Sequence, residues 1–159
     1  MRYLFIIAAI IYLGSIAMCC FMMHENHKRC KVVERRLKVL SNMQANLLNN
    51  VEELSKIISA ECMQCDSVEK ALVGSVVLNR AETEGYPDNI HDVINDKNAF
   101  HGLYGSQYVY DPLSYRIALS LLCGVNRNQE VVFFYRRNIA KPSFVTKIIY
   151  SRKYHNFGI

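Results

Sequence analysis

Hydrophobic and polar positions divide the chain into one continuous apolar run and several shorter periodic segments. Residues 3–23 contain no charged side chain, and a helix of roughly 20 apolar residues is long enough to cross a bilayer core. The run lacks the small-residue cleavage site that ends a secretory signal peptide. This pattern predicts a transmembrane signal-anchor helix over residues 1–24.

The next segment, 25–53, is predicted to form a helical stalk. Between Cys30 and Ile58 there is no Gly or Pro, and a row of mostly apolar positions, called the seam below, alternates four and three residues apart. Such spacing is typical of a coiled coil. It leaves two structures open: a homodimer through residues 33–58, or one amphipathic helix that packs within its own chain. The seam consists of Val33, Leu37, Leu40, Gln44, Leu47, Val51, Leu54 and Ile58.

The rest of the chain alternates helical patterns with turns. Apolar positions predict a buried helix over 71–78, a short helix over 90–94 and an amphipathic helix over 114–122, which Gly124 ends. Turn residues at 84–89 and a segment rich in Gly and Tyr at 101–112 separate them. Residues 131–135 are β-prone. We therefore expect a mainly α fold with a small β element over residues 54–159.

The charge and the cysteine content of the chain limit the kinds of partner and cofactor to expect. The net charge of +5 and the pI of about 8.9 suit an anionic surface such as a cell wall or a lipid membrane. No nucleic-acid motif accompanies this charge, so no nucleic-acid partner is expected. Cys62 and Cys65 form a C-x-x-C pair, but the sequence has no second pair to complete a zinc site. We accordingly expect no metal and no cofactor.

Glu61 is the residue whose setting points to chemistry. It follows Leu54, Ile57 and Ile58 by about one helical turn, so the same helix face can surround its carboxyl group with apolar side chains. A carboxylic acid in such surroundings keeps its proton more readily than an exposed one and can donate it to a leaving oxygen. A solvated surface glutamate at a helix end is the alternative that the pattern leaves open.

Residues 60–80 read A-E, then a polar turn, then an apolar helix that ends V-V-L-N-R. This order resembles the SleB-type cell-wall hydrolases, a family of spore-cortex-lytic and phage muralytic enzymes, and the resemblance extends over about residues 54–158. It implies a lysozyme-like domain that cleaves the glycan strands of peptidoglycan. It also implies that Glu61 is the catalytic acid.

The same resemblance implies the residues that contact the substrate. Phe100, Tyr135 and Asn138 match positions of the family on the cleft wall, and Asn79 ends the motif helix. Tyr104 is a further candidate, because an aromatic ring can stack on the apolar face of a sugar. Packing within its own loop is the alternative for Tyr104.

Two departures from the family pattern are visible. Cys65 stands where the family has an acidic residue, and Gly158 stands where a terminal aromatic residue is usual. His155 precedes that position, and the sequence assigns it no chemical role. These departures support a rival interpretation, in which the chain is a non-catalytic, membrane-anchored glycan-binding or assembly protein of a phage or a cell envelope.

The expected reaction and its location follow from the residues available. A usual glycoside hydrolase needs two carboxylates, whereas no motif marks a second acid here. We therefore expect a lytic transglycosylase, in which Glu61 serves as both acid and base. The substrate requires a periplasmic or otherwise extracytoplasmic domain, or delivery in a virion. The basic cluster at 28–38 favours the opposite topology by the positive-inside rule.

Overall fold

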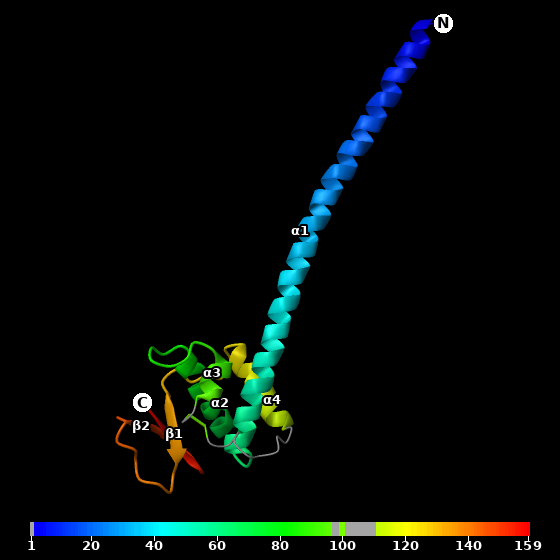
Figure 1. The fold of residues 1–159 in the computed structure, drawn as a ribbon. Helices are drawn as coiled ribbons and strands as arrows, with labels where there is room; N and C mark the ends of the chain where they lie inside the picture. Colours follow the sequence, from blue (N-terminus) through cyan, green and yellow to red (C-terminus); the bar gives the residue numbers. More distant parts are fainter. Residues whose placement is uncertain (1, 97–98, 101–110) are drawn as a thin grey trace. The chain divides into compact units, whose positions relative to one another are not determined.

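A computed structural model describes residues 2–96, 99–100 and 111–159, without the side chains at 2, 4, 5 and 7–10. The chain divides into two compact units, residues 1–45 and 46–159. Helix α1 (Arg2–Cys62) supplies all described residues of the first unit and the beginning of the second (Figure 1).

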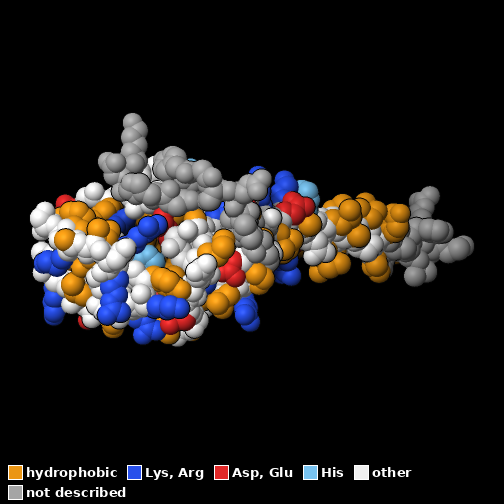
Figure 2. All heavy atoms as spheres, turned by 90° about the horizontal axis from the view of Figure 1, so that it is seen from below, with side chains coloured by type: hydrophobic (Ala, Val, Ile, Leu, Met, Phe, Trp, Pro, Cys, Tyr) orange, Lys and Arg blue, Asp and Glu red, His pale blue; other side chains and the backbone are white. Residues whose placement is uncertain are grey.

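Apolar side chains are exposed along the first unit. Ile11, Leu13 and Phe21 are each more than half exposed, and Figure 2 shows hydrophobic side chains around the helix next to its undescribed N-terminal residues. In the described part of the chain, we find no helix both long enough and apolar enough to span a membrane. The structure thus does not support the transmembrane helix predicted over 3–23.

The described residues of the second unit form three further helices and one small sheet (Figure 1). The helices are α2 (Ser67–Ala81), α3 (Ile90–Asn95) and α4 (Pro112–Leu122). The strands β1 (Phe133–Arg136), β2 (Ile148–Ser151) and β3 (His155–Gly158) pair antiparallel in the order β1-β3-β2. The prediction of a mainly α fold with a small β element is confirmed at this level. Residues 133–135 of the β-prone run at 131–135 lie in β1, whereas β2 and β3 were not predicted.

The core of the second unit lies where the end of α1 packs with α2 and α4. Ile58 of α1, Val76 of α2 and Leu121 of α4 are at most 1% exposed. Gly74 allows α2 to approach its neighbours closely, since a Cβ there would lie 2.5 Å from Leu121 Cδ1 and 2.8 Å from Ile58 Cδ1. The apolar stripe at 71–78 is thus a buried face, as the sequence predicted.

The heptad seam of α1 divides at the boundary between the two units. Val51, Leu54 and Ile58 are completely buried within the unit 46–159. By contrast, the earlier seam positions Val33, Leu37, Leu40 and Leu47 are 41–61% exposed. The C-terminal part of the seam therefore packs within its own chain, and a dimer could use only residues 33–47.

The end of the V-V-L-N-R motif holds the segment that leads into β1. The amide of Asn79 donates hydrogen bonds to the carbonyl oxygens of Asn128 and Val131, at 2.8 and 2.6 Å. Arg80 donates from Nε to the carbonyl of Val132 at 2.9 Å. Its guanidinium lies 5.1 Å from the ring centre of Phe100, and burial lowers its pKa. These contacts fix where β1 starts, and thereby where its far end lies.

The missing terminal aromatic residue has a packing explanation. Gly158 is buried in the central strand β3 and pairs with Phe133 on one side and Ile148 on the other. A Cβ at this position would lie 2.1 Å from the carbonyl oxygen of Lys147. The backbone before β2 therefore occupies the space that a side chain at 158 would need.

Candidate active site

A pocket of about 680 Å³ lies between the end of α1, the turn that follows it and the sheet. The turn 63–66 supplies one wall, and the end of β1 with the residues before β3 supplies the other. The lining residues are Glu61, Cys62, Met63, Gln64, Cys65, Arg136, Arg137, Asn138, Lys153, Tyr154 and His155.

Glu61 is held in the last turn of α1 and is half-buried. Helix α1 ends at the next residue, and the turn 63–66 follows. Asp66, the last residue of this turn, caps α2 by accepting a hydrogen bond from the Glu69 amide at 2.8 Å. That hydrogen bond lowers the pKa of Asp66. Glu61 thus belongs to the end of a helix rather than to a loop.

The charges around the pocket are mostly positive. Arg136, Arg137 and Lys153 are exposed lining residues. A hydrogen bond with Tyr154 raises the pKa of Lys153, whose Nζ lies 4.9 Å from the centre of the Tyr154 ring. Among the described lining residues, Glu61 is the single carboxylate. The pocket therefore combines one acid with a cationic rim suited to an anionic polymer.

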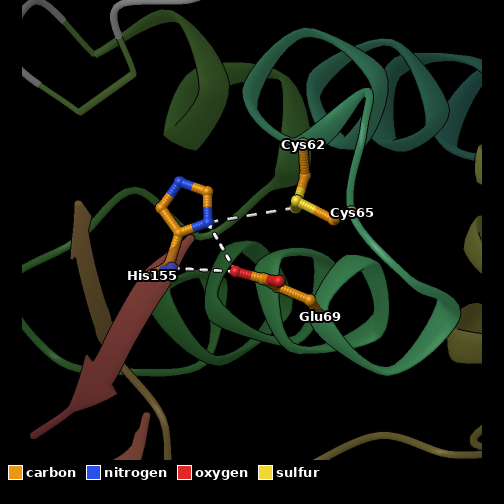
Figure 3. A group of neighbouring side chains, drawn as sticks. All are labelled: Cys62, Cys65, Glu69 and His155. Atoms are coloured by element: carbon orange, nitrogen blue, oxygen red, sulfur yellow. Dashed lines mark hydrogen bonds and ion pairs between the residues drawn. A yellow bond between two sulfur atoms is a disulfide. The ribbon is translucent and has the colours of Figure 1, made fainter. Parts of the chain in front are cut away.

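Behind this pocket, Glu69 and His155 form a buried pair. Glu69 is completely buried, and its Oε1 accepts hydrogen bonds from the backbone N–H groups of Tyr154 and His155 at 3.0 and 2.8 Å. The Nδ1 of His155 lies 3.0 Å from the same oxygen. Figure 3 shows Glu69 pointing from α2 toward the start of β3, where His155 lies. This pair positions the first residue of β3 against the pocket.

Cys62 and Cys65 are joined by a disulfide that closes the turn after Glu61. Cys62 Sγ lies 4.0 Å from His155 Nδ1, so the disulfide, the histidine and Glu69 form one buried cluster (Figure 3). The four other cysteines, at positions 19, 20, 30 and 123, are exposed and free.

The residues predicted from the sequence lie in different places. Glu61 and Asn138 both line the pocket. Asn79, Phe100 and Tyr135 are buried, and none of them is a lining residue. Tyr104 lies outside the described residues. Of the five predicted site residues that the structure describes, two thus lie together in the pocket.

Other lining residues had no clear sequence signal. Arg136, Arg137, Lys153 and Tyr154 come from the ends of β1 and β3, which are far apart in the sequence from Glu61 and from each other. His155 was identified only as part of a family-like ending. Glu69 was not singled out at all, although an acidic residue one turn after a helix cap and next to a C-x-x-C pair could have drawn attention.

Comparisons with known proteins identify the family and the fold. A family model described as Cell Wall Hydrolase matches residues 66–157, a range that begins just after Glu61. The crystal structure of the catalytic domain of the Bacillus cereus SleB protein has a similar fold, with a TM-score of 0.63 and 16% identity over 70% of this chain and 91% of that chain. No curated protein matched the sequence. Because the family model covers more than half of its length, the chain belongs to the cell wall hydrolase family of the SleB type.

Proposed function

We propose that this cell wall hydrolase cleaves the glycan strands of peptidoglycan as a lytic transglycosylase, with Glu61 as its acid and base. The observation that supports this proposal is the position of Glu61, which is the single carboxylate among the described lining residues of a pocket with a cationic rim. The lysozyme-like reaction expected from the sequence needs an acid in this kind of setting.

In the first step, Glu61 would protonate the glycosidic oxygen between N-acetylmuramic acid and N-acetylglucosamine. The bond from the anomeric carbon to that oxygen then breaks. In the second step, the carboxylate accepts the proton of the muramic acid 6-hydroxyl as that oxygen attacks the anomeric carbon. The product is a 1,6-anhydro sugar, Glu61 regains its proton, and no water is consumed.

The available carboxylates favour this route over hydrolysis with two acids. Inverting and retaining hydrolases place a second carboxylate about 5–10 Å from the first, on the substrate. Neither Asp66 nor Glu69, the two acidic residues that follow Glu61 in the chain, lines the pocket. Asp66 is paired with Arg152, and Glu69 is completely buried with its Oε1 already bound to two backbone amides. Glu69 therefore cannot reach a sugar in the pocket.

The other lining residues would bind the polymer. Asn138 is exposed at the end of β1 and can hydrogen-bond to the acetamido or hydroxyl groups of a sugar. Arg136, Arg137 and Lys153 can pair with the carboxylates of the lactyl and peptide substituents of peptidoglycan. In this proposal Asn79, Phe100 and Tyr135 act indirectly, by supporting β1, which leads into the turn that contains Asn138.

The loss of turbidity of purified peptidoglycan tests the role of Glu61. Glu61→Gln keeps the size of the side chain but removes the proton, so we expect activity to fall by a factor of about 100 or more. Glu52→Gln is a matched control, because Glu52 lies on the same helix, is exposed and does not line the pocket. Equal activity of a folded Glu61→Gln protein and the control would remove Glu61 from the mechanism.

A further inference from the structure

The buried cluster beside the pocket contains four groups that are ligands for transition metals. Cys62 ends α1, Cys65 lies in the following turn, Glu69 is in the first turn of α2, and His155 begins β3 (Figure 3). All four residues are less than 9% exposed, and one potential ligand atom of each lies within 4.8 Å of all the others. Segments far apart in the sequence thus bring four donors to one point.

One atom of this cluster lacks a partner. Glu69 Oε2 is buried and has no hydrogen-bond partner among the described residues. A buried carboxylate oxygen without a partner costs free energy, and native structures rarely leave one uncompensated. The neighbouring Oε1 accepts hydrogen bonds from the backbone of Tyr154 and His155, so the Glu69 carboxylate is fixed beside His155 while its second oxygen stays buried without a partner.

We propose that Cys62, Cys65, Glu69 and His155 bind one Zn²⁺ ion when the Cys62–Cys65 disulfide is reduced. Thiolate, imidazole and carboxylate are each ligand types that tetrahedral zinc accepts, and C-x-x-C is a usual spacing for two of its ligands. Ligand atoms at about 2.0–2.3 Å from a tetrahedral zinc ion lie roughly 3.3–3.8 Å apart. The longest distances in the cluster would contract by about 1–1.5 Å to reach this geometry. The two sulfur atoms would move apart once the bond between them is broken.

The two states are chemically exclusive, because the sulfur atoms of a disulfide are not thiolates. A dithiol supplies two electrons and two protons to the disulfide, which becomes two thiols while the dithiol becomes a disulfide. Zinc then displaces the two thiol protons into solvent as the zinc–sulfur bonds form. His155 coordinates through Nδ1 as the neutral imidazole, with its proton on Nε2.

Both states would hold the same turn. The disulfide joins the residue after Glu61 to the turn 63–66, and a zinc ion bound by the same sulfur atoms would join this turn to α2 and β3 as well. The site therefore offers a cross-link next to Glu61 in reducing as well as oxidising surroundings. This inference does not rest on the catalytic role proposed for Glu61.

Metal analysis of the full chain tests the site. A variant with the exposed cysteines at 19, 20, 30 and 123 replaced by Ser retains only the buried pair. After reduction with dithiothreitol, addition of Zn²⁺ and desalting, we expect one zinc per chain, and none in the sample left oxidised. Co²⁺ added to the reduced variant should give the thiolate charge-transfer and tetrahedral ligand-field absorption of a site with sulfur ligands.

Substitutions within the cluster complete the test. Cys62→Ser with Cys65→Ser should abolish zinc binding. Glu69→Gln should weaken zinc binding more than about tenfold, because removing a group that merely orients a zinc ligand already costs about that much. Circular dichroism shows whether each variant is folded. Zinc should raise the melting temperature of the reduced protein that retains Cys62, Cys65, Glu69 and His155, here called the parent, and of no cluster variant. A reduced, folded parent without zinc would overturn the proposal, as would zinc binding that survives loss of both cysteines or is unchanged in Glu69→Gln.

Discussion

Replacing Asp111 by Asn should destabilise the unit 46–159, because it leaves the charge of Lys70 buried without its counter-ion. The Lys70 side chain is 2% exposed, and its Nζ lies 2.7 Å from Asp111 Oδ2 and 3.1 Å from Ser114 Oγ. Asp111 also caps α4 by accepting a hydrogen bond from the Leu113 amide. Asn is an equally good capping residue, so the substitution isolates the loss of charge.

The expected cost follows from the burial of the pair. Removing one partner of a buried ion pair typically costs about 3–5 kcal/mol. The pKa of Asp111 gives a second figure: burial acts to raise it, but hydrogen bonds from Lys70, Ser114 and the Leu113 amide outweigh burial and lower it from 3.8 to about 2. Since one pKa unit corresponds to about 1.4 kcal/mol, ionisation of Asp111 contributes on the order of 2 kcal/mol.

The sign of the pH dependence is fixed by this lowered pKa. The contribution of Asp111 is complete above the ordinary value of 3.8, and it is lost as the pH falls through about 2. The free energy of unfolding of the parent should therefore fall over this range. In Asp111→Asn this part of the pH dependence should be missing.

Urea unfolding followed by tyrosine fluorescence measures both effects, because the chain has ten Tyr and no Trp. The matched control is the double variant Lys70→Met with Asp111→Asn, which removes both charges and should regain most of the lost stability. A loss below about 1 kcal/mol in the single variant would place the pair among exposed ion pairs. A double variant no more stable than the single one would also refute the reasoning.

Two further predictions concern packing. Gly158→Ala should lower the free energy of unfolding by about 1–3 kcal/mol, because its Cβ would meet the backbone oxygen of Lys147. Gly14→Ala is the control, since a Cβ at Gly14 meets nothing within 4 Å. Equal melting temperatures of the two variants would contradict the packing account. A fragment of residues 30–159 should self-associate through the exposed seam at 33–47, and Leu40→Ser with Leu47→Ser should abolish this; sedimentation that shows a monomer at all concentrations would exclude the dimer.

The helices could be predicted from the sequence because each depends on local periodicity and caps. The stripe at 71–78, the short pattern at 90–94 and the pattern at 114–122 correspond to α2, α3 and α4. The strands β2 and β3 could not be predicted, because their four-residue segments have no alternating pattern and exist only through pairing with each other and with β1.

Only the wall of the pocket that contains Glu61 could be predicted from the sequence. Glu61 stands at the end of a helix whose apolar face is visible in the sequence, and the family-like motif gives its spacing. The facing wall depends on how Asn79 and Arg80 hold the start of β1, and on how Glu69 holds the start of β3. Such contacts join residues about 50 to 90 positions apart and leave no local pattern.

The most direct test of the central claim is mass spectrometry of the products released from purified peptidoglycan by the parent protein. If Glu61 acts alone as acid and base, the glycan fragments should end in 1,6-anhydro-muramic acid, and Glu61→Gln should release none of them while Glu52→Gln releases the parental amount. Fragments that carry only reducing ends would contradict the account, because a water molecule and a second catalytic group would then be required.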